Sequence, residues 1–178
     1  MVAYQSRDEM LDDLVQLMKR KKWLSSHLWE VAVDNILWNW TGFHGKTVGC
    51  PYWSESALEA YERENRLPLE PKLIHEHVIP KSILIELLSK EASANRKTLK
   101  DFMNSCVVGA VVTKEEHVRL HQQDDTCDWS SLSVAKTDDN FVFARYQKAK
   151  IKVWHVNWSK RTLLKDERYL ICKGENES

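Results

Sequence analysis

Leu73-Ile-His-Glu-His-Val-Ile-Pro80 is the stretch that decides the expected fold of this 178-residue chain. It sets an acidic residue beside a histidine in an apolar, β-branched run that ends at a proline, which is typical of a short strand. About forty residues later, Val111-Val-Thr-Lys-Glu-Glu-His-Val-Arg-Leu-His121 sets two histidines four positions apart behind a Thr-x-x-Glu capping box. This second stretch predicts a strand that leads directly into a helix.

The elements around these two motifs follow from the residue pattern. We expect strands over 73–79 and 107–112, with Gly109 as a candidate bulge, and a helix over 82–91 between them. Thr113 is the expected N-cap of the last helix. Because the two strands enclose a helical insertion, we predict the α+β class, with a mainly helical domain built around a small strand-strand-helix core.

Capping and periodicity also predict the remaining elements. Residues 124–139 are expected to form a polar loop, and 163–172 receive no assignment. Further helices are expected over 6–19, 26–40, 53–65 (capped by Ser56 and Glu59) and 140–149, and a strand over 151–156. We expect one domain, 1–178, with a helical N-terminal part at 1–66, the core with its insertion at 70–123 and a basic C-terminal part at 140–178.

The composition bounds the class of protein. Hydrophobic residues make up 43% and charged residues 29%, which is ordinary for a folded globular domain. The four cysteines lie far apart without a C-x-x-C pair, which argues against a zinc ribbon and a disulfide framework. The first residues lack an apolar signal core and no run approaches a membrane span, so we expect a cytoplasmic protein with no membrane partner.

The charge is balanced overall but uneven along the chain. The formal net charge is zero, which is the main compositional objection to a nucleic-acid partner. Residues 145–168, however, hold eight Lys or Arg against two acids, a local balance of +6, and 19–22 form a second basic run. A phosphate-binding face and a set of solvated helix faces explain this pattern about equally well. The candidate phosphate contacts are Lys81, Lys114, Lys148, Lys150, Lys152, Lys160 and Arg161.

The two motifs supply the groups that phosphodiester hydrolysis needs. A histidine can take a proton from water, and a divalent ion can stabilise the charge on phosphorus. Glu76 and His77 point to opposite faces of a strand, so one would bind metal while the other approaches the phosphate from another side. His117 and His121 project from one helix face and can share an ion. Mixed carboxylate and imidazole ligation suits zinc, manganese or nickel, and magnesium less well.

Both motifs resemble those of one enzyme superfamily. Glu76-His77-Val78-Ile79-Pro80 looks like the first motif of the HNH (ββα-metal, His-Me finger) endonucleases. The run from Val112 to His121 is similar to their closing helix motif, and most like that of the colicin nuclease domains. The resemblance covers about fifty residues of 178. It implies a ββα-metal core and a one-metal endonuclease that leaves 5′-phosphate ends, with DNA ahead of RNA as its substrate and a homodimer left open.

The resemblance also implies a role for each matching residue. Glu76, His117 and His121 would be ligands of one divalent metal ion, and His77 would be the general base. Asn104 is the nearest counterpart of the central Asn of the family, although it lies further from His117 than is usual. The long separation of the two motifs requires the helix over 82–91 to be an insertion.

Two other readings stay open beside this one. A zinc hydrolase acting on another bond would be expected to carry an H-E-x-x-H string, and the chain has none. A catalytically inactive, metal-stabilised ββα domain could instead serve as an interaction module. The presence of His77 beside Glu76 argues against that reading, because a purely structural metal site has no use for a base.

Overall fold

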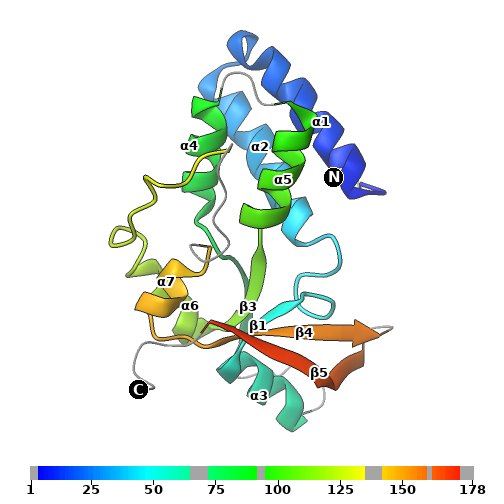
Figure 1. The fold of residues 1–178 in the computed structure, drawn as a ribbon, viewed down its shortest axis with the longest axis vertical. Coiled ribbons are helices and arrows are strands. Elements are labelled where there is room, and N and C mark those ends of the chain that lie inside the picture. Colours follow the sequence, from blue (N-terminus) through cyan, green and yellow to red (C-terminus); the bar gives the residue numbers. More distant parts are fainter. Residues whose placement is uncertain (1–3, 65–71, 92–94, 135–141, 160–161, 173–178) are drawn as a thin grey trace. The chain divides into compact units, whose positions relative to one another are not determined.

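The computed structural model describes residues 4–64, 72–91, 95–134, 142–159 and 162–172 (Figure 1). The chain divides into two compact units, each assembled from three separate segments. Helices dominate the first unit, and the second contains a five-stranded mixed sheet, so the expected α+β class is confirmed. The first unit comprises Met1–Phe43, Ile79–Val108 and Trp129–Val142, and the second comprises His44–Val78, Gly109–Asp128 and Phe143–Ser178.

The first unit is a packed group of helices. Side chains of Ser6, Ser25 and Asn95 cap three of them by accepting a backbone N–H. α1 packs against α2 and α5, and α2 packs against α4, so that their apolar stripes are buried together. The helices are α1 (Arg7–Arg20), the 3₁₀ turn η1 (Lys21–Trp23), α2 (Ser26–Thr41), α4 (Lys81–Lys90) and α5 (Arg96–Cys106).

Three of these helices match the ranges predicted from the sequence, and a fourth was not predicted. α1, α2 and α4 lie within one or two residues of the expected ranges, and Gly42 ends α2 as expected. α5 was not expected, although Leu99, Phe102, Met103 and Cys106 are buried at helical spacing behind the Asn95 cap. α4 and α5 together form the helical insertion between the two motif strands, and both belong to the first unit.

The second unit is organised by its sheet, whose strand order is β2-β3-β1-β4-β5. β2 and β3 pair antiparallel, from Leu73 opposite Thr113 to His77 opposite Gly109, and β3 pairs parallel with β1. α6 packs against both β2 and β3, and α3 packs against β1 and β3. The elements are β1 (Tyr52–Ser54), α3 (Glu55–Glu64), β2 (Leu73–His77), β3 (Gly109–Thr113), α6 (Lys114–His121), α7 (Ala144–Lys148), β4 (Val153–Ser159) and β5 (Thr162–Cys172).

Several expectations for the second unit need correction. The ladder between β2 and β3 runs without a register shift, so Gly109 is a regular strand end and not a bulge. The expected helix over 53–65 begins only at Glu55, because Tyr52–Ser54 forms β1. Ser54, and not Ser56, caps that helix, because its Oγ accepts the amide of Ala57 at 3.2 Å.

The C-terminal part of the second unit also differs from the expected ranges. β4 begins at Val153 and continues to Ser159, beyond the expected 151–156. β5, at the edge of the sheet, fills the part that received no assignment. Within the described residues, the expected helix over 140–149 is reduced to α7, and positions 140 and 141 lie outside them. α6 and α7 lie side by side (Figure 1), where Arg119 Nη1 donates to the carbonyl of Ala149 at 3.4 Å.

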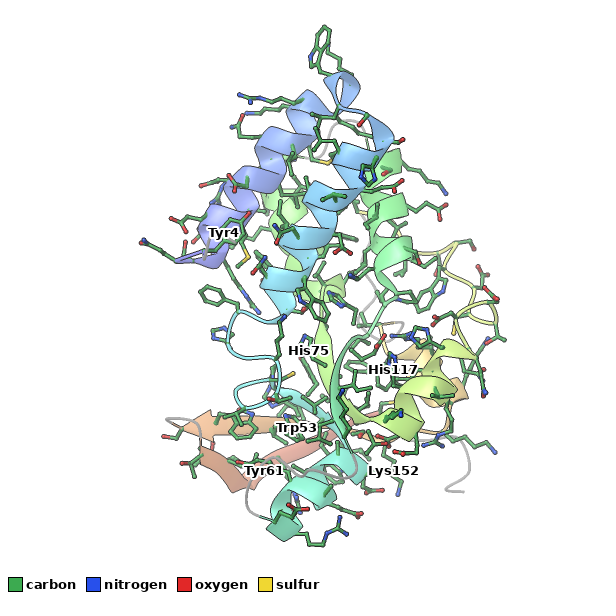
Figure 2. The ribbon with its side chains drawn as sticks, turned by 180° about the vertical axis from the view of Figure 1, so that it is seen from behind. Tyr4, Trp53, Tyr61, His75, His117 and Lys152 are labelled. Atoms are coloured by element: carbon green, nitrogen blue, oxygen red, sulfur yellow. The ribbon has the colours of Figure 1, made fainter. Side chains whose placement is uncertain are left out.

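Aromatic side chains pack α3 onto the sheet. Trp53 is fully buried, and its ring centroid lies 5.4 Å from that of Tyr61 and 5.7 Å from that of Trp158. Figure 2 labels Trp53 and Tyr61 in this cluster. Rings at such separations, in tilted or edge-to-face arrangements, add to the free energy gained by burying their surface. Because Trp53 belongs to β1, its burial gives that short strand a place in the core.

Glu116 joins the start of α6 to two strands. Thr113 and Glu116 form the expected capping box, in which each side chain accepts the backbone amide of the other residue. Glu116 is 3% exposed, and its Oε2 also accepts the hydroxyl of Ser54 at 2.5 Å. A single buried carboxylate therefore fixes α6 against β1 and β3.

Among the described residues, the helices are too short or too polar to span a lipid bilayer.

Replacing Glu116 by alanine should lower the free energy of unfolding by about 1–3 kcal/mol, because the Ser54 hydroxyl and the Thr113 amide lose a buried acceptor. Urea denaturation followed by circular dichroism measures this change. Glu115→Ala is the matched control, since Glu115 is exposed on the same helix turn and should shift the value by no more than about 0.5 kcal/mol. Equal losses in the two variants would contradict the role given to Glu116.

Candidate metal site

Glu76, His117 and His121 come together in the second unit. Each offers one ligand atom, and these atoms lie within 4.8 Å of one another. Glu76 belongs to β2, and the two histidines belong to α6, where Figure 2 labels His117. The chain enters α6 directly from β3, the antiparallel neighbour of β2, so the helix returns across the strand that carries the acid. The expected grouping of these three residues is therefore present.

Glu76 and His117 approach each other closely without forming a hydrogen bond. His117 Nδ1 lies 2.8 Å from Glu76 Oε2, yet within the described ranges no group is aligned to hydrogen-bond with that buried nitrogen. Two atoms bound to one ion have this relation, since each points at the ion and not at the other. With bonds of about 2.0–2.2 Å, ligand atoms at near right angles lie about 3 Å apart. The short distance thus suits a pair of metal ligands.

His121 is the more exposed histidine, and an acid holds its ring. The His117 and His121 ring centroids lie 4.4 Å apart with the rings nearly perpendicular at 85°. His121 Nδ1 lies 3.0 Å from Asp124 Oδ2, which leaves Nε2 as the nitrogen that can face an ion. A carboxylate on the far ring nitrogen fixes the tautomer and orientation of a ligating histidine and makes it a stronger ligand.

Arg145 holds both carboxylates of the site in place. Its side chain is 1% exposed, and its two terminal nitrogens each lie 2.6 Å from an acid, Nη2 from Glu76 Oε1 and Nη1 from Asp124 Oδ1. Nε donates to the carbonyl of Val78 at 2.9 Å, and Nη2 also donates to the carbonyl of His77. Each acid therefore gives one oxygen to Arg145 and turns the other toward a histidine.

The charges of this network suit a cation. Burial by itself lowers the pKa of Arg145, but Tyr146, Glu76 and Asp124 raise it, and the net shift is upward, so the guanidinium stays charged. Two carboxylates and one guanidinium give the group a net charge of −1 when both histidines are neutral. One carboxylate oxygen with two imidazole nitrogens suits zinc, manganese or nickel, and such a three-residue set leaves coordination positions for water or substrate.

His77 lies on the other face of β2. Alternation along the strand puts it with His75, and the two ring centroids are 6.2 Å apart. His77 is 3% exposed, and Figure 2 labels its neighbour His75. The ring of His77 is thus outside the Glu76, His117 and His121 group, whereas its carbonyl supports Arg145. The general-base role of His77 stays a prediction.

Asn104 does not belong to the same unit as the metal group. It lies on α5 in the first unit, and its side chain is exposed. Its expected catalytic role stays a prediction, and the described geometry of the second unit gives it no support.

The expected phosphate contacts fall into distinct environments. Lys114, Lys148 and Lys150 are exposed in the second unit, on or beside the two helices α6 and α7. Lys152 lies 3.7 Å from Glu55, which neutralises part of its charge. Lys81 belongs to the first unit, where its Nζ lies 2.5 Å from Asp34 Oδ1. Lys160 and Arg161 fall outside the described residues.

Two residues that support the site, Asp124 and Arg145, were not predicted from the sequence. Asp124 follows His121 by three positions, and a histidine paired with a nearby acid is a signal that could have found it. Arg145 was counted only as one charge of a basic segment. Nothing local marks it, because its partners are 69 and 21 positions away.

Asp124→Asn should weaken metal binding by about ten- to a hundredfold, since an amide supports the His121 ring without the charge that orients and activates it. Isothermal titration with Zn²⁺ or Mn²⁺ measures the affinity. Asp125→Asn is the matched control, because Asp125 is the exposed neighbour, and it should bind metal as the parent protein does. Identical affinities in all three proteins would show that Asp124 does not support the site.

Comparison with known proteins adds no relative. No family model matches the chain, and neither a curated protein nor a solved structure matches it at a significant level. The site described above therefore rests on the residues and geometry of this chain alone.

Proposed function

We propose that this chain is a metal-dependent nuclease of the HNH type that hydrolyses phosphodiester bonds in nucleic acid, with DNA ahead of RNA. The observation that carries the proposal is the convergence of Glu76 with His117 and His121. The order of the supporting elements adds to it: two antiparallel strands lead into a helix that returns across them. This is the order that the resemblance to the ββα-metal nucleases implies.

The site residues divide the work of such a reaction. A bound divalent ion would polarise the scissile phosphate and offset the charge that develops on it. Glu76, His117 and His121 would hold that ion, leaving its remaining positions to the phosphate and to water. Arg145 keeps the Glu76 carboxylate from turning away, and Asp124 keeps the His121 ring aligned. Holding ligands in place before substrate arrives is how such sites avoid reorganisation during the reaction.

The proposal keeps His77 as the base that takes a proton from water. A neutral imidazole is suited to that step, and the residue stands next to a metal ligand in the sequence. Since its ring is buried on the other face of β2, the assignment is tested separately from the metal site.

A specific observation favours a second candidate function. The burial of His77 and the engagement of one Glu76 oxygen by Arg145 also suit a metal site that stabilises the fold without catalysis. The domain would then be an interaction module, as some metal-stabilised domains are. This candidate predicts metal binding and a metal-dependent gain in thermal stability, but no cleavage of nucleic acid.

Glu76→Gln and His117→Ala should each abolish both metal binding and cleavage, because each removes one ligand of a three-residue set. Plasmid DNA and a single-stranded oligonucleotide, incubated with Zn²⁺, Mn²⁺, Ni²⁺ or Mg²⁺ and with or without EDTA, measure cleavage. Glu115→Gln is the matched control for the acid. If the parent protein binds metal tightly but cleaves nucleic acid under none of these conditions, the result would favour the interaction module over the nuclease.

His77→Ala should reduce cleavage by about a hundred- to ten-thousandfold while leaving metal affinity unchanged, which is the mark of a base that is not a ligand. His75→Ala, on the same face of the same strand, serves as the comparison, since it tests whether any loss reflects damage to β2. Loss of metal from the His77 variant would assign it as a ligand instead. Equal cleavage by the parent and the His77 variant would place the base elsewhere.

Replacing Lys148 and Lys150 together by glutamine should weaken DNA binding and flatten its salt dependence, by close to one unit of slope for each lost phosphate contact. Both side chains are exposed in the second unit. Lys152→Gln is the control, because that side chain lies beside Glu55. Fluorescence anisotropy at several salt concentrations measures both quantities. An effect of Lys152→Gln as large as that of the double variant would contradict the choice of residues.

A further inference from the structure

Trp23 is the most exposed large hydrophobic side chain among the described residues. Its side chain is 76% exposed, whereas those of Trp29, Trp40 and Trp53 are each 4% exposed or less. An indole gains a large free energy from burial, and of the eight tryptophans only Trp23 is exposed, the others being buried or half-buried. A single exposed hydrophobic residue is ordinary on a protein surface. Trp23 differs because four cationic residues precede it directly in the sequence.

The local structure explains how Trp23 comes to be exposed. α1 ends at Arg20, η1 covers Lys21–Trp23, and α2 begins after the Ser25 cap. The apolar stripes of α1 and α2 are already buried in the first unit. Trp23 therefore lies in the connection between two helices whose buried stripes do not include it, a few positions before Leu28 and Val31 of α2, which are 52% and 53% exposed.

The four residues before Trp23 are all cationic. Lys19, Arg20 and Lys22 are exposed, and the Nζ of Lys22 lies 4.8 Å from the centre of the Trp23 ring. Lys21 is less exposed, and its Nζ lies over Trp29. Across the described part of the chain, no carboxylate forms an ion pair with any of these four side chains. Their charge is thus available to an anionic ligand.

The ligand that fits both features is a single-stranded nucleic acid. An unpaired base offers a flat face for an indole, and the phosphates on either side of it are spaced to meet neighbouring cations. A lipid surface fits less well, because interfacial helices present a continuous apolar face to the membrane. Here the buried stripes of both adjoining helices are used in the core, and the two exposed large apolar residues of α2, Leu28 and Val31, are too few to form such a face.

We infer that Lys19–Trp23 is a binding site for single-stranded nucleic acid. Trp23 stacks on an unpaired base, and Lys19, Arg20 and Lys22 contact the adjacent phosphates. The inference rests on the proposed function in taking nucleic acid as the substrate. The segment belongs to the first unit and the metal group to the second, so binding here does not require the metal ligands.

The experiment uses the full chain treated with EDTA, so that no cleavage occurs during the measurement. Anisotropy of a fluorescein-labelled single-stranded oligothymidine, and of a duplex of the same length, gives the affinities of the parent protein and its variants. Trp23→Ala should weaken single-strand binding by about five- to a hundredfold, the usual effect of removing one stacking side chain. Trp23→Phe should restore part of the affinity, and duplex binding should change far less.

A combined Lys19→Gln, Arg20→Gln and Lys22→Gln variant should weaken single-strand binding and reduce the salt slope by up to about two units. Tyr169→Ala is the matched aromatic control, since Tyr169 is 55% exposed in the second unit, and Lys97→Gln is the control for an exposed cation in the first. Neither control should change the affinity. Circular dichroism of each variant checks that its helices are intact.

Unchanged single-strand affinity in Trp23→Ala would overturn the inference. It would also be overturned if Trp23→Ala abolished binding to vesicles of anionic phospholipid while oligonucleotide affinity stayed the same, because the segment would then bind a membrane. Loss of oligonucleotide affinity in Trp23→Ala supports the inference even if the parent protein cleaves nothing with any metal. In that outcome the nuclease proposal fails alone.

Discussion

The buried guanidinium of Arg145 is the interaction on which the candidate site depends. It binds an oxygen of Glu76 and an oxygen of Asp124, and it also satisfies the carbonyls of His77 and Val78. Arginine is suited to this position because its planar fork can meet two carboxylates at once. Without it, two acids would stand close together in a poorly solvated region, and both would lose the partner that fixes their second oxygen. The arrangement of the metal group therefore depends on a residue that would not itself touch the metal.

Neighbouring acids of the helix motif have unlike roles because of where α6 sits. Glu116 is buried as the cap of the helix and as the acceptor for Ser54, whereas Glu115 is exposed. The buried acid sets the position of the first turn against β1 and β3. That position in turn directs His117 toward the strand that carries Glu76. Capping and ligation are thus linked, since a helix that began one residue later would rotate both histidines away from the acid.

The division into two units separates two chemical features of the chain. The metal group, its supporting residues and the exposed lysines of α7 and its C-cap region lie in the second unit. The bare indole and its cations lie in the first, where the fold is helical and α4 and α5 are inserted between the two motif strands. Each feature has its own structural support, so each can be altered by substitution without removing the other. A neutral net charge is compatible with this, because the segments 19–22 and 145–168 each carry a local excess of positive charge.

Local signals in the sequence were enough to predict α1, α2, α4, the cap of α6 by Thr113 and the two motif strands, because capping and periodicity act over a few residues. The same is true of His117 and His121, which share a helix face at any tertiary position. α5 carried a readable pattern that was overlooked. Tertiary structure alone decided the rest. β1 exists through pairing with the distant strands β3 and β4, Arg145 reaches Glu76 across 69 positions, and the depth of His77 depends on what covers its face of β2. Such features come from contacts between remote segments, and no local pattern encodes them.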